Sequence, residues 1–550
     1  MVRKFLNHKS KTIFSAAFVL AVAALTSRIL GLIRDRLLAG RFGAGDELDI
    51  YYTAFRLPDL VFSILIMGAI SSAFIPVLTE YFHKKKKEAW QLVSGVLNLA
   101  ILALIIIIGI LIVFAPALIS LIAPGFSGSK REMTILLTRI MFLSPMLLGI
   151  SSIFSGILQY FKRFFIYSLA PIIYNIGIII GILFFVPALG LVGLAWGVVL
   201  GAFLHMLIQL PSAIYSGFRW RPKSNIFHPG VKKVAKLMIP RTIGLAGFQI
   251  NFLVITAIAS TLASGSIAIF NLANNLQYVP IGIFGITLAT AAFPNLAKAF
   301  TRKNRRAFSR DFSSTFSQIL FLIIPLSALF FILRAQIVRV ILGTGQFSWL
   351  DTRLTAAALG IFSLSIFAQG LIPLISRAFY AFQNTRTPVL ISLFSILLNI
   401  CFSFLFVWIL TSANIFSSFF STILKLEGIK EIAVLGLPLA FSLANLVNFI
   451  VLLKIFDRKI GCWQSKRILI SFIKIIFATL LMGLTTYSFL YLLNIFLVTN
   501  TFIGIFSQAI LAALAGFVIY CLAMTLLKAP EIGLITKSIK DKLTTYFHTT

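Results

Sequence analysis

The chain has 550 residues, of which 59% are hydrophobic and only 11% are charged, and its mean hydropathy is +1.01. This composition excludes an ordinary soluble domain and is typical of a protein that crosses a membrane many times. The net charge of +33 comes from basic residues gathered between apolar runs. That distribution indicates cytoplasmic loops of a membrane protein, so no nucleic-acid partner is expected.

Fourteen apolar runs are long enough to cross a hydrocarbon core of roughly 30 Å. Because backbone polar groups in lipid must be hydrogen-bonded within each segment, these runs are expected to be helices. The predicted fold class is therefore an all-α polytopic membrane protein with about 14 transmembrane helices. The predicted spans are 12–33, 56–79, 91–123, 133–158, 167–187, 190–216, 238–263, 266–296, 312–342, 354–382, 388–411, 432–455, 468–495 and 502–527.

Basic clusters occur in every second connection between these spans. Because connections rich in Lys and Arg tend to stay in the cytoplasm, the clusters indicate which connections are cytoplasmic. Both termini are therefore predicted to be cytoplasmic. Residues 1–25 also have the pattern of a cleaved signal peptide, but cleavage there would remove most of the first span and invert this assignment. The intervals assigned to the cytoplasm are 3–11, 84–87, 162–163, 219–236, 298–310, 377–386, 454–467 and 528–542.

An internal repeat is suggested when the chain is displaced by 219 residues, which pairs Ala54 with Ala273 and Phe74 with Phe293. Both segments belong to the second span of a set of six, and each ends in a Phe/Pro turn before a basic loop. The expected domains are an N-terminal lobe of six helices (1–218), a C-terminal lobe of six (219–460), and a last part with two extra helices and a cytoplasmic tail (461–550).

Charge is concentrated in SRILGLIRDRLLAGRFGAGDELDIYYTAFRLPDL, at the first span and the segment that follows it. A charge at the centre of a spanning helix costs about 2.5–3.5 kcal/mol on insertion scales, so such residues usually face a hydrated cavity or a ligand. Arg28 and Asp35 fall within about 20° of each other on a helix, while Arg34 is about 120° from Arg28. One interpretation is a cavity wall whose guanidinium groups bind phosphate. The other is an Arg28–Asp35 ion pair that ties helices together.

The second half carries a polar stripe of neutral side chains in FNLANNLQYVP, at Asn271, Asn274, Asn275 and Tyr278. These groups could contact sugar or peptide parts of a cargo, or they could hydrogen-bond neighbouring helices. His205 and Gln209, four residues apart, are expected to form interhelical hydrogen bonds. From residue 133 to residue 527 the predicted span interiors contain no carboxylate, so cation coupling through one has no candidate there.

The chain resembles the MurJ (MviN) lipid II flippases of the multidrug/oligosaccharidyl-lipid/polysaccharide exporter superfamily. SRILGLIRD, RFGAGDELDIYYTAFRLPDL and GAISSAFIPVL are similar to that family's first two helices and their loop. SRAFYAFQNTRTPVLISLFSILLN resembles its tenth and eleventh helices. The resemblance implies a MATE-like bundle of two six-helix lobes with an alternating-access cavity, and a groove for the lipid tail formed by the last two helices.

The function implied by the resemblance is transport without enzymatic chemistry. The cargo would be lipid II, carried from the inner to the outer leaflet of the bacterial cytoplasmic membrane. Membrane lipids and cell-wall synthases would be further partners. No cofactor is expected, and the energy source is left open between the membrane potential and a monovalent cation.

Carried over by position, the family's essential residues fall on Arg28, Arg34, Asp35 and Asp49. The chain also departs from the family pattern. Phe62, Ser63 and Met67 replace charged residues of the second helix, and Asn274 and Asn275 replace an acidic and a basic residue of the eighth. We hypothesise that Arg56 supplies part of the missing positive charge.

A sodium site described in some members of that family is matched only in part. Asn399 and Ser403 fall on its eleventh-helix positions, but its aspartate position is Ile255 here. The resemblance therefore gives only weak support to a metal site in this chain.

Three other functions remain as alternatives. The first is an exporter of another lipid-linked polysaccharide or a teichoic-acid unit, and the second is a drug/cation antiporter of the same superfamily. The third is a membrane glycosyltransferase, in which Asp46, Glu47 and Asp49 would hold a metal.

Overall fold

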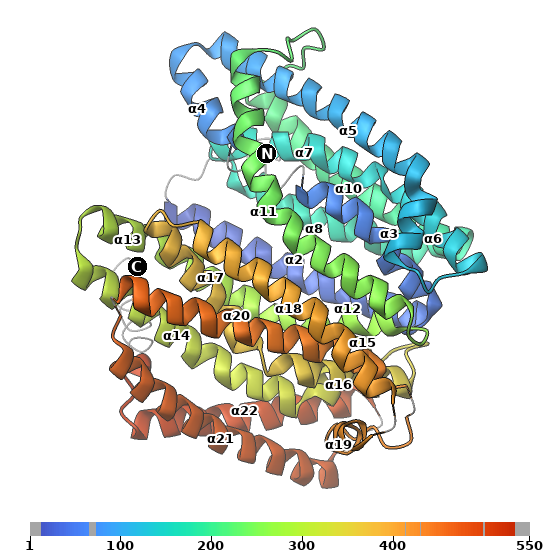
Figure 1. Ribbon diagram of the computed structural model, residues 1–550, viewed down its shortest axis with the longest axis vertical. Coiled ribbons are helices and arrows are strands. Elements are labelled where there is room, and N and C mark those ends of the chain that lie inside the picture. Colours follow the sequence, from blue (N-terminus) through green and yellow to red (C-terminus); the bar gives the residue numbers. More distant parts are fainter. Residues whose placement is uncertain are drawn as a thin grey trace, which may run out of the picture. The chain divides into compact units, whose positions relative to one another are not determined.

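The computed structural model describes residues 13–64, 73–412, 414–429, 431–461, 463–498 and 501–533 (Figure 1). Within those ranges the chain forms helices joined by turns and contains no strand. The basic cluster at 3–11, Met67 and the end of the tail beyond residue 533 lie outside the described residues. The all-α fold predicted from the apolar runs is confirmed.

Within the described residues, each predicted span of the first half coincides with one helix or with two or three consecutive helical elements. Several are longer than the apolar run, because polar turns extend them beyond the hydrocarbon. The helices are α2 (Ile13–Phe42), α3 (Asp46–Phe62), α4 (Ile75–Lys84), α5 (Lys86–Ile122), α6 (Gly128–Met141), α7 (Leu143–Tyr160), α8 (Phe164–Ile180), η3 (Gly181–Phe185), α9 (Val186–Leu189), α10 (Leu191–Tyr215) and α11 (Pro229–Ser260).

The second half follows the same correspondence. Its helices are α12 (Ser266–Pro280), η4 (Ile281–Ile286), α13 (Thr287–Thr301), α14 (Arg305–Ile332), α15 (Arg334–Leu342), α16 (Trp349–Ser363), α17 (Ile366–Ala381), α18 (Arg386–Thr411), α19 (Ile415–Ile423), η5 (Ala433–Leu435), α20 (Gly436–Ile460), α21 (Ser465–Phe496) and α22 (Phe502–Leu526). Ten helices of the described chain are long and apolar enough to span a membrane, and the α16–α17 pair, bent by 44°, makes an eleventh. The other three predicted spans correspond to α2, to α3 with α4, and to α11.

The helices form two compact units. The first contains the chain through Ala268 together with Thr344–Phe347, and the second contains Ile269–Gly343 and the chain from Ser348 onward. Helix α11 belongs to the first unit, where it packs on α3, α4 and α5. The lobe boundaries predicted at 218/219 and 460/461 follow a sequence repeat rather than contacts, and they stay predictions.

Glu80 ties α4 to α11 just beyond the predicted span 56–79. Its carboxylate accepts hydrogen bonds from Lys233 Nζ at 2.6 Å and from Lys84 Nζ at 3.1 Å. These two ammonium groups lower the pKa of the Glu80 carboxyl below its ordinary value, so the ion pair persists at neutral pH. The contact joins α4 to α11 at this end.

Local irregularities in the helices agree with the displacement of 219 residues. Helix α5 begins at Lys86 and α14 at Arg305, which are 219 residues apart. Residues 63–64 lie in a π-helical turn, and so do the corresponding residues within η4. Wide turns of this kind are rare, so their placement at matching positions supports an internal repeat.

The η4 turn directly follows Pro280, which has no backbone N–H to donate. The hydroxyl of Thr287 donates a hydrogen bond to the Gly282 carbonyl at 2.9 Å. A side chain thus adds a hydrogen bond to a carbonyl within the wide turn.

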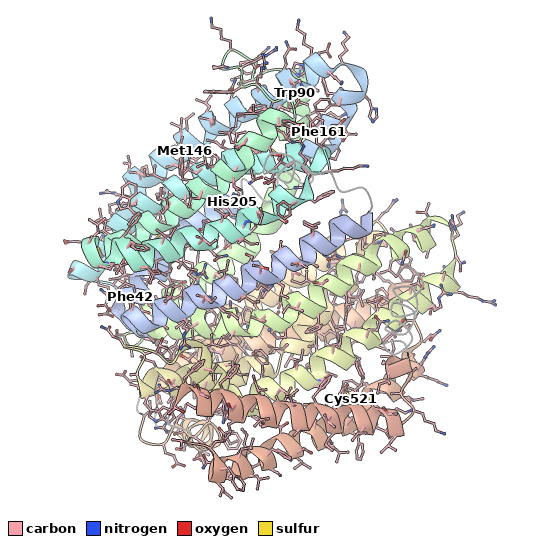
Figure 2. All side chains as sticks on the ribbon, turned by 180° about the vertical axis from the view of Figure 1, so that it is seen from behind. Phe42, Trp90, Met146, Phe161, His205 and Cys521 are labelled. Atoms are coloured by element: carbon pink, nitrogen blue, oxygen red, sulfur yellow. The ribbon has the colours of Figure 1, made fainter. Side chains whose placement is uncertain are left out.

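Each unit has an aromatic cluster in its core. In the first, Trp90 and Phe161 lie near each other (Figure 2), and their rings stack with centroids 6.1 Å apart. The ring of Trp90 also meets Phe82 edge-on at 5.1 Å. In the second, Phe312 of α14 stacks on Phe456 of α20 at 4.5 Å. Such ring pairs contribute about 0.5–1.5 kcal/mol beyond the area they bury.

Helices α8 and α10 approach each other along a line of glycines. A Cβ atom on Gly177 would overlap the backbone of Gly201, and one on Gly181 would overlap Gly197. Small residues of this kind let two membrane helices come into backbone contact, where dispersion supplies the attraction that lipid does not.

We predict that Gly177→Ala destabilises the first unit by about 1–3 kcal/mol, because the added methyl group forces α8 away from α10. Thermal unfolding of the purified chain in detergent measures the effect. Gly109→Ala in α5 is the matched control, since nothing lies within 4 Å of its added Cβ. Equal losses for both variants would show that close approach is not the cause.

Candidate functional site

The charged end of α2 is organised around Arg34 and Asp35. Arg34 places Nη2 at 2.8 Å and Nε at 3.1 Å from Asp35 Oδ1. Its Nη1 donates to Asn175 Oδ1 of α8 at 3.3 Å. The Asp35 side chain is buried, whereas 21% of the Arg34 side chain is accessible. The aspartate therefore neutralises and orients an arginine that solvent or a ligand can still reach.

Asn175 connects this ion pair to the preceding part of α2. Its amide Nδ2 lies 3.3 Å from the Ser27 hydroxyl, to which it donates a hydrogen bond, and 3.0 Å from the Pro171 carbonyl. Arg28, the other predicted arginine of this helix, is next to Ser27 and is partly buried. The sequence suggested an Arg28–Asp35 pair, but the ion pair described at Asp35 is with Arg34.

The arrangement leaves binding capacity at Arg34. A guanidinium carries five N–H donors, and three of those on Arg34 are used by Asp35 and Asn175. The remaining donors have the planar geometry that matches phosphate oxygens. The contacts of Arg34 thus fit a preoriented anion-binding group.

Asp49, on the first turn of α3, lies in a different set of contacts. Its oxygens accept hydrogen bonds from the backbone N–H groups of Gly265, at 2.8 Å, and Ala268, at 2.9 Å. Lys130 Nζ from α6 approaches to 3.1 Å, and only 2% of Asp49 is exposed. A carboxylate at the start of a helix is favoured by the helix dipole, and here it caps α12.

Asp46 extends this cluster toward solvent. It accepts hydrogen bonds from Lys130 Nζ at 2.5 Å and from the Ser264 hydroxyl at 2.6 Å. Lys130 also lies over the ring of Phe126, 4.3 Å from its centroid. The lysine is thus shared between two carboxylates that differ in burial, since 55% of the Asp46 side chain is exposed.

Glycines allow the segment before α12 to reach the α2–α3 turn. Gly265 has φ +85°, and a Cβ there would collide with the Ala44 carbonyl. The backbone N–H of Gln346 donates to the Gly40 carbonyl at 2.9 Å in the same region. The turn between α2 and α3 is therefore contacted by two distant loop segments of the first unit, one at Gly265 and one at Gln346.

Arg56, two turns after Asp49, faces α11. Its Nε donates to the Thr256 hydroxyl at 3.0 Å, and its guanidinium carbon lies 5.1 Å from the centroid of the Phe252 ring. The Ser63 hydroxyl, further along the same chain segment, accepts a hydrogen bond from Gln249 Nε2 at 2.6 Å. Arg56 and Ser63 thus each form a side-chain hydrogen bond with a residue of α11.

The asparagine stripe of α12 lies in the second unit. Asn271 is buried, Asn274 and Asn275 are partly exposed, and Gln277 Nε2 donates to Asn274 Oδ1 at 3.0 Å. Gln277 in turn accepts from Gln369 Nε2 of α17 at 3.0 Å. The stripe therefore continues into a buried amide network, and interhelical hydrogen bonding is present at its Gln277 end.

That network reaches a third helix through hydroxyl groups. Gln369 Nε2 lies 2.9 Å from Ser365 Oγ, which donates to Ser442 Oγ of α20 at 3.1 Å. Asn271, Asn274 and Asn275 belong to the second unit, whereas Arg34 and Asp49 belong to the first. Their predicted contact with a cargo stays a prediction.

Asn399 and Ser403 lie on the buried face of α18 that packs on α20. One turn earlier on this face, Ser395 donates to the Ala444 carbonyl at 2.8 Å. Among the described residues no three His, Cys, Asp or Glu side chains are close enough together to hold a metal ion. The sodium position stays a prediction.

His205 and Gln209 form the predicted interhelical hydrogen bonds. The Ser151 hydroxyl of α7 lies 2.7 Å from His205 Nδ1, and Gln209 accepts from the Ser155 hydroxyl at 2.7 Å. This prediction is confirmed, and the pair has a packing role between α7 and α10.

Several residues of these contact sets were not anticipated from the sequence. Asn175, Lys130 and Thr256 each pair with a predicted residue, from helices α8, α6 and α11 respectively. Asn175 could have been identified from the sequence, because a polar amide within an apolar span usually hydrogen-bonds another helix. Lys130 and Thr256 had none, since their partners are 81 and 200 residues away in the sequence.

Comparisons with known proteins agree over most of the chain. A family profile described as "Lipid II flippase MurJ" matches residues 38–508. The probable lipid II flippase MurJ of Buchnera aphidicola subsp. Acyrthosiphon pisum is 30% identical over 490 residues, which are 88% of this chain and 91% of that protein. The corresponding Vibrio cholerae protein is 30% identical over 414 residues, covering 72% and 78% of the two chains.

Solved structures show the same relationship at the level of the fold. One titled "Lipid II flippase MurJ, inward closed conformation" has a TM-score of 0.75 and 25% identity, covering 94% of this chain and all of that one. An inward-facing multidrug resistance MATE family transporter has a TM-score of 0.65 at 15% identity, covering 81% of this chain and 98% of that one. The second likeness concerns the fold alone.

We predict that Asp49→Ala lowers the free energy of unfolding by about 1.5–3 kcal/mol, because two backbone N–H groups and Lys130 lose a charged acceptor. Denaturant titration of the purified chain in detergent measures the loss. Asp46→Ala is the matched control on the same helix, and its exposed ion pair contributes about 0–1 kcal/mol. A loss for Asp46→Ala as large as that for Asp49→Ala would contradict the helix-capping role.

Proposed function

This chain belongs to the lipid II flippase MurJ family, and on that premise we propose that it carries lipid II from the inner to the outer leaflet by alternating access. Lipid II is a disaccharide-pentapeptide joined to undecaprenol by a diphosphate. The observation that carries this proposal is Arg34, whose guanidinium is oriented by Asp35 and Asn175 and keeps unused donors. An oriented guanidinium binds a diphosphate with less loss of side-chain entropy than a flexible one.

Binding of the diphosphate would change the charge balance on α2. Asp35 forms an ion pair with Arg34, and the anionic cargo would compete for the same guanidinium. A ligand shifts a conformational equilibrium only by the difference in its affinity for the two states. We infer that cargo contact with Arg28 and Arg34 differs between inward-open and outward-open states.

We propose that the protein forms no covalent bond with its cargo. The glycosyltransferase alternative needs Asp46 and Asp49 as metal ligands or catalytic carboxylates. In the structure these carboxylates are engaged by Lys130, Ser264 and the backbone before and within α12. The contacts of both residues therefore support a structural role at the start of α3.

The chain is an integral multi-pass membrane protein, and we propose the bacterial cytoplasmic membrane as its location, with both termini in the cytoplasm. The basic intervals support that orientation, since they fall at alternate helix connections. Cell-wall synthases that use the exported precursor are proposed partners.

For the energy source we propose the membrane potential, without a cofactor. Ile255, at the position of an aspartate in a described sodium site, is buried and apolar, which leaves Asn399 and Ser403 without a carboxylate from that position. The aspartate of that site would supply the negative charge that balances the cation, and this chain has none at the corresponding position. Moving one charge through the membrane field is worth about 2.3 kcal/mol per 100 mV.

The central test is rescue of bacteria depleted of their own lipid II flippase. The wild-type chain is expected to restore growth and the outer-leaflet fraction of lipid II. Arg34→Ala is expected to reduce export about tenfold or more, from the loss of charge-assisted contacts of about 1.5–3 kcal/mol, and Arg34→Lys to lie in between. Arg219→Ala, at an exposed position between α10 and α11, is the control.

Export of a different surface glycan, with no rescue of lipid II, would favour an exporter of another lipid-linked polysaccharide or a teichoic-acid unit. Normal lipid II export by Arg34→Ala would contradict the role of the oriented guanidinium.

Arg56 provides a second prediction. If it supplies positive charge lost elsewhere in the second helix, Arg56→Ala lowers export more than Thr256→Val, which removes only the hydroxyl that Arg56 contacts. Outer-leaflet lipid II in the depleted strain measures both. Full export by Arg56→Ala, with Arg28→Ala inactive, would show that Arg56 does not compensate.

A further inference from the structure

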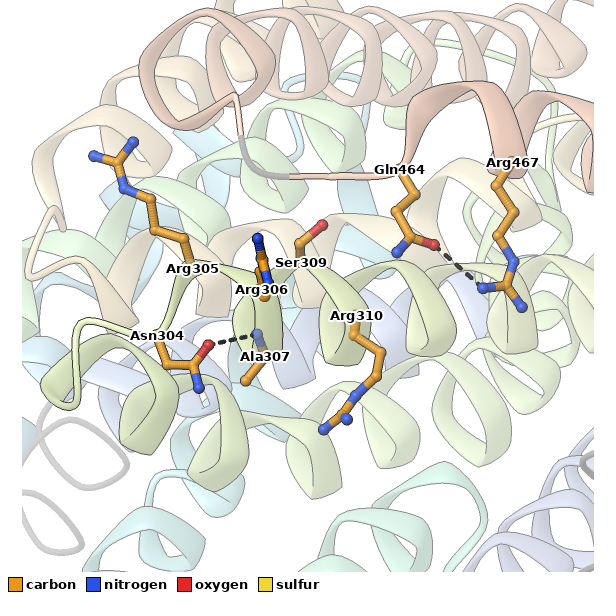
Figure 3. A pocket seen from close by; sticks show the side chains of 8 residues that line it. All are labelled: Asn304, Arg305, Arg306, Ala307, Ser309, Arg310, Gln464 and Arg467. Atoms are coloured by element: carbon orange, nitrogen blue, oxygen red, sulfur yellow. Dashed lines mark hydrogen bonds between the residues drawn. The ribbon is translucent and has the colours of Figure 1, made fainter.

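A pocket of about 740 Å³ lies at the start of α14 and α21, entirely within the second unit. It is lined by Asn304, Arg305, Arg306, Ala307, Ser309, Arg310, Gln464 and Arg467 (Figure 3). Four of these eight side chains are arginines. None of them belongs to the candidate transport site described above.

The charges of this pocket are poorly balanced. Arg310 forms an ion pair with Asp311 at 3.1 Å, and it is the only one of the four arginines with a described ion pair to a carboxylate. Arg467 Nη1 donates to the neutral Gln464 side chain at 3.3 Å (Figure 3). Arginines gathered in one pocket repel each other, and an anion relieves this repulsion.

Two long helices begin at the pocket, which adds to its positive potential. Asn304 accepts a hydrogen bond from the Ala307 N–H at 2.9 Å, while α21 begins after Gln464 without a side-chain cap. Gln464 N donates to the Ser313 hydroxyl at 2.9 Å, which holds the start of α21 against α14. The dipoles of both helices favour negative charge at these ends.

The position of the pocket indicates that the anion belongs to a lipid. The predicted spans of α14 and α21 begin at residues 312 and 468, next to the pocket residues. On α21, Leu469, Ile470 and Ile473 follow directly and are 56–59% exposed. A ligand bound here would therefore meet arginines at one end and an apolar helix surface at the other.

Trp463 directly precedes the pocket residue Gln464 at the start of α21. Its indole N–H donates to Asp457 Oδ1 at 2.5 Å, and its ring lies 5.8 Å from that of Phe316. Tryptophan is enriched where the hydrocarbon meets the headgroups. Arginine clusters at this depth on the cytoplasmic side are suited to phospholipid headgroups.

We propose that this pocket binds the phosphate of an anionic phospholipid of the inner leaflet, with the acyl chains along the exposed face of α21. Arg306 and Arg467, which come from different helices, hold the phosphate between them. The bound lipid thereby joins the starts of α14 and α21. The site is separate from the one proposed for lipid II.

Native mass spectrometry of the purified full-length chain in detergent tests the proposal. The probes are phosphatidylglycerol, phosphatidylcholine and inorganic pyrophosphate, all without lipid II. Wild type is expected to retain phosphatidylglycerol. The double variant Arg306→Gln/Arg467→Gln should bind it about 30-fold more weakly, from about 1 kcal/mol per arginine near a membrane surface. Arg219→Gln/Arg221→Gln removes the same charge from another basic loop and should bind as wild type does.

Three outcomes would overturn the proposal. Equal weakening by both double variants would mean that total charge matters and the pocket does not. Retention of pyrophosphate with no preference for phosphatidylglycerol would identify a site for soluble anions. Unchanged phosphatidylglycerol binding by Arg306→Gln/Arg467→Gln would exclude the pocket.

A second measurement locates the lipid independently of the arginine variants. The fluorescence difference between wild type and Trp463→Phe reports on the start of α21 in vesicles. Brominated phosphatidylglycerol should quench this difference more strongly than brominated phosphatidylcholine, and equal quenching would contradict the site. Neither measurement depends on transport, so failure here leaves the rescue result unaffected.

Discussion

A charged group inside a membrane protein has to find its partners within the protein, because the surrounding lipid offers none. This constraint accounts for the arrangement of α2 and α3. Asp35 is neutralised by Arg34, and Asp49 by Lys130 together with backbone N–H groups before and within α12. Asp49 thus holds the start of α12, while Asp35 orients Arg34, whose guanidinium contacts Asn175 of α8.

The same constraint separates structural charges from those available to a ligand. Both oxygens of Asp49 are occupied, and the residue is almost completely buried. Arg34 has one strong partner, one amide partner and an accessible surface. Two residues that the resemblance treats alike therefore have different physical roles, one capping a helix and the other presenting donors. The arginines at the start of α14 and α21 extend this contrast to the membrane surface, where water can solvate them until a lipid phosphate takes its place.

The sequence was sufficient to predict the helices, because hydrophobic length is a local property and lipid permits few alternatives. It was insufficient for the contacts of the charged side chains. Helical spacing placed Asp35 on the face of Arg28, but it did not predict the ion pair between Asp35 and the adjacent Arg34. Asp49 meets residues that are 216 and 219 positions further along the chain, and no local pattern contains that information.

The polar stripe of α12 illustrates the same limit within a correctly predicted helix. Its spacing indicated that the asparagines share a face, and Gln277 extends their hydrogen bonds within the second unit. The partner of Gln277 is Gln369 on α17, which only the tertiary packing identifies. Lobe boundaries have a similar difficulty, since the repeat places α11 in the second lobe while its contacts, including Glu80 with Lys233, lie in the first unit.

The wide turn after Pro280 has a consequence for mechanical compliance. A regular helix resists flexure because bending it exposes carbonyl groups that lose their donors. At η4 one carbonyl is already served by the Thr287 hydroxyl, a donor on a rotatable side chain rather than on the rigid backbone. When the helix bends there, the Thr287 side chain can rotate and keep its hydrogen bond to the Gly282 carbonyl. A change of direction between α12 and α13 therefore costs less free energy than the same bend in an uninterrupted helix.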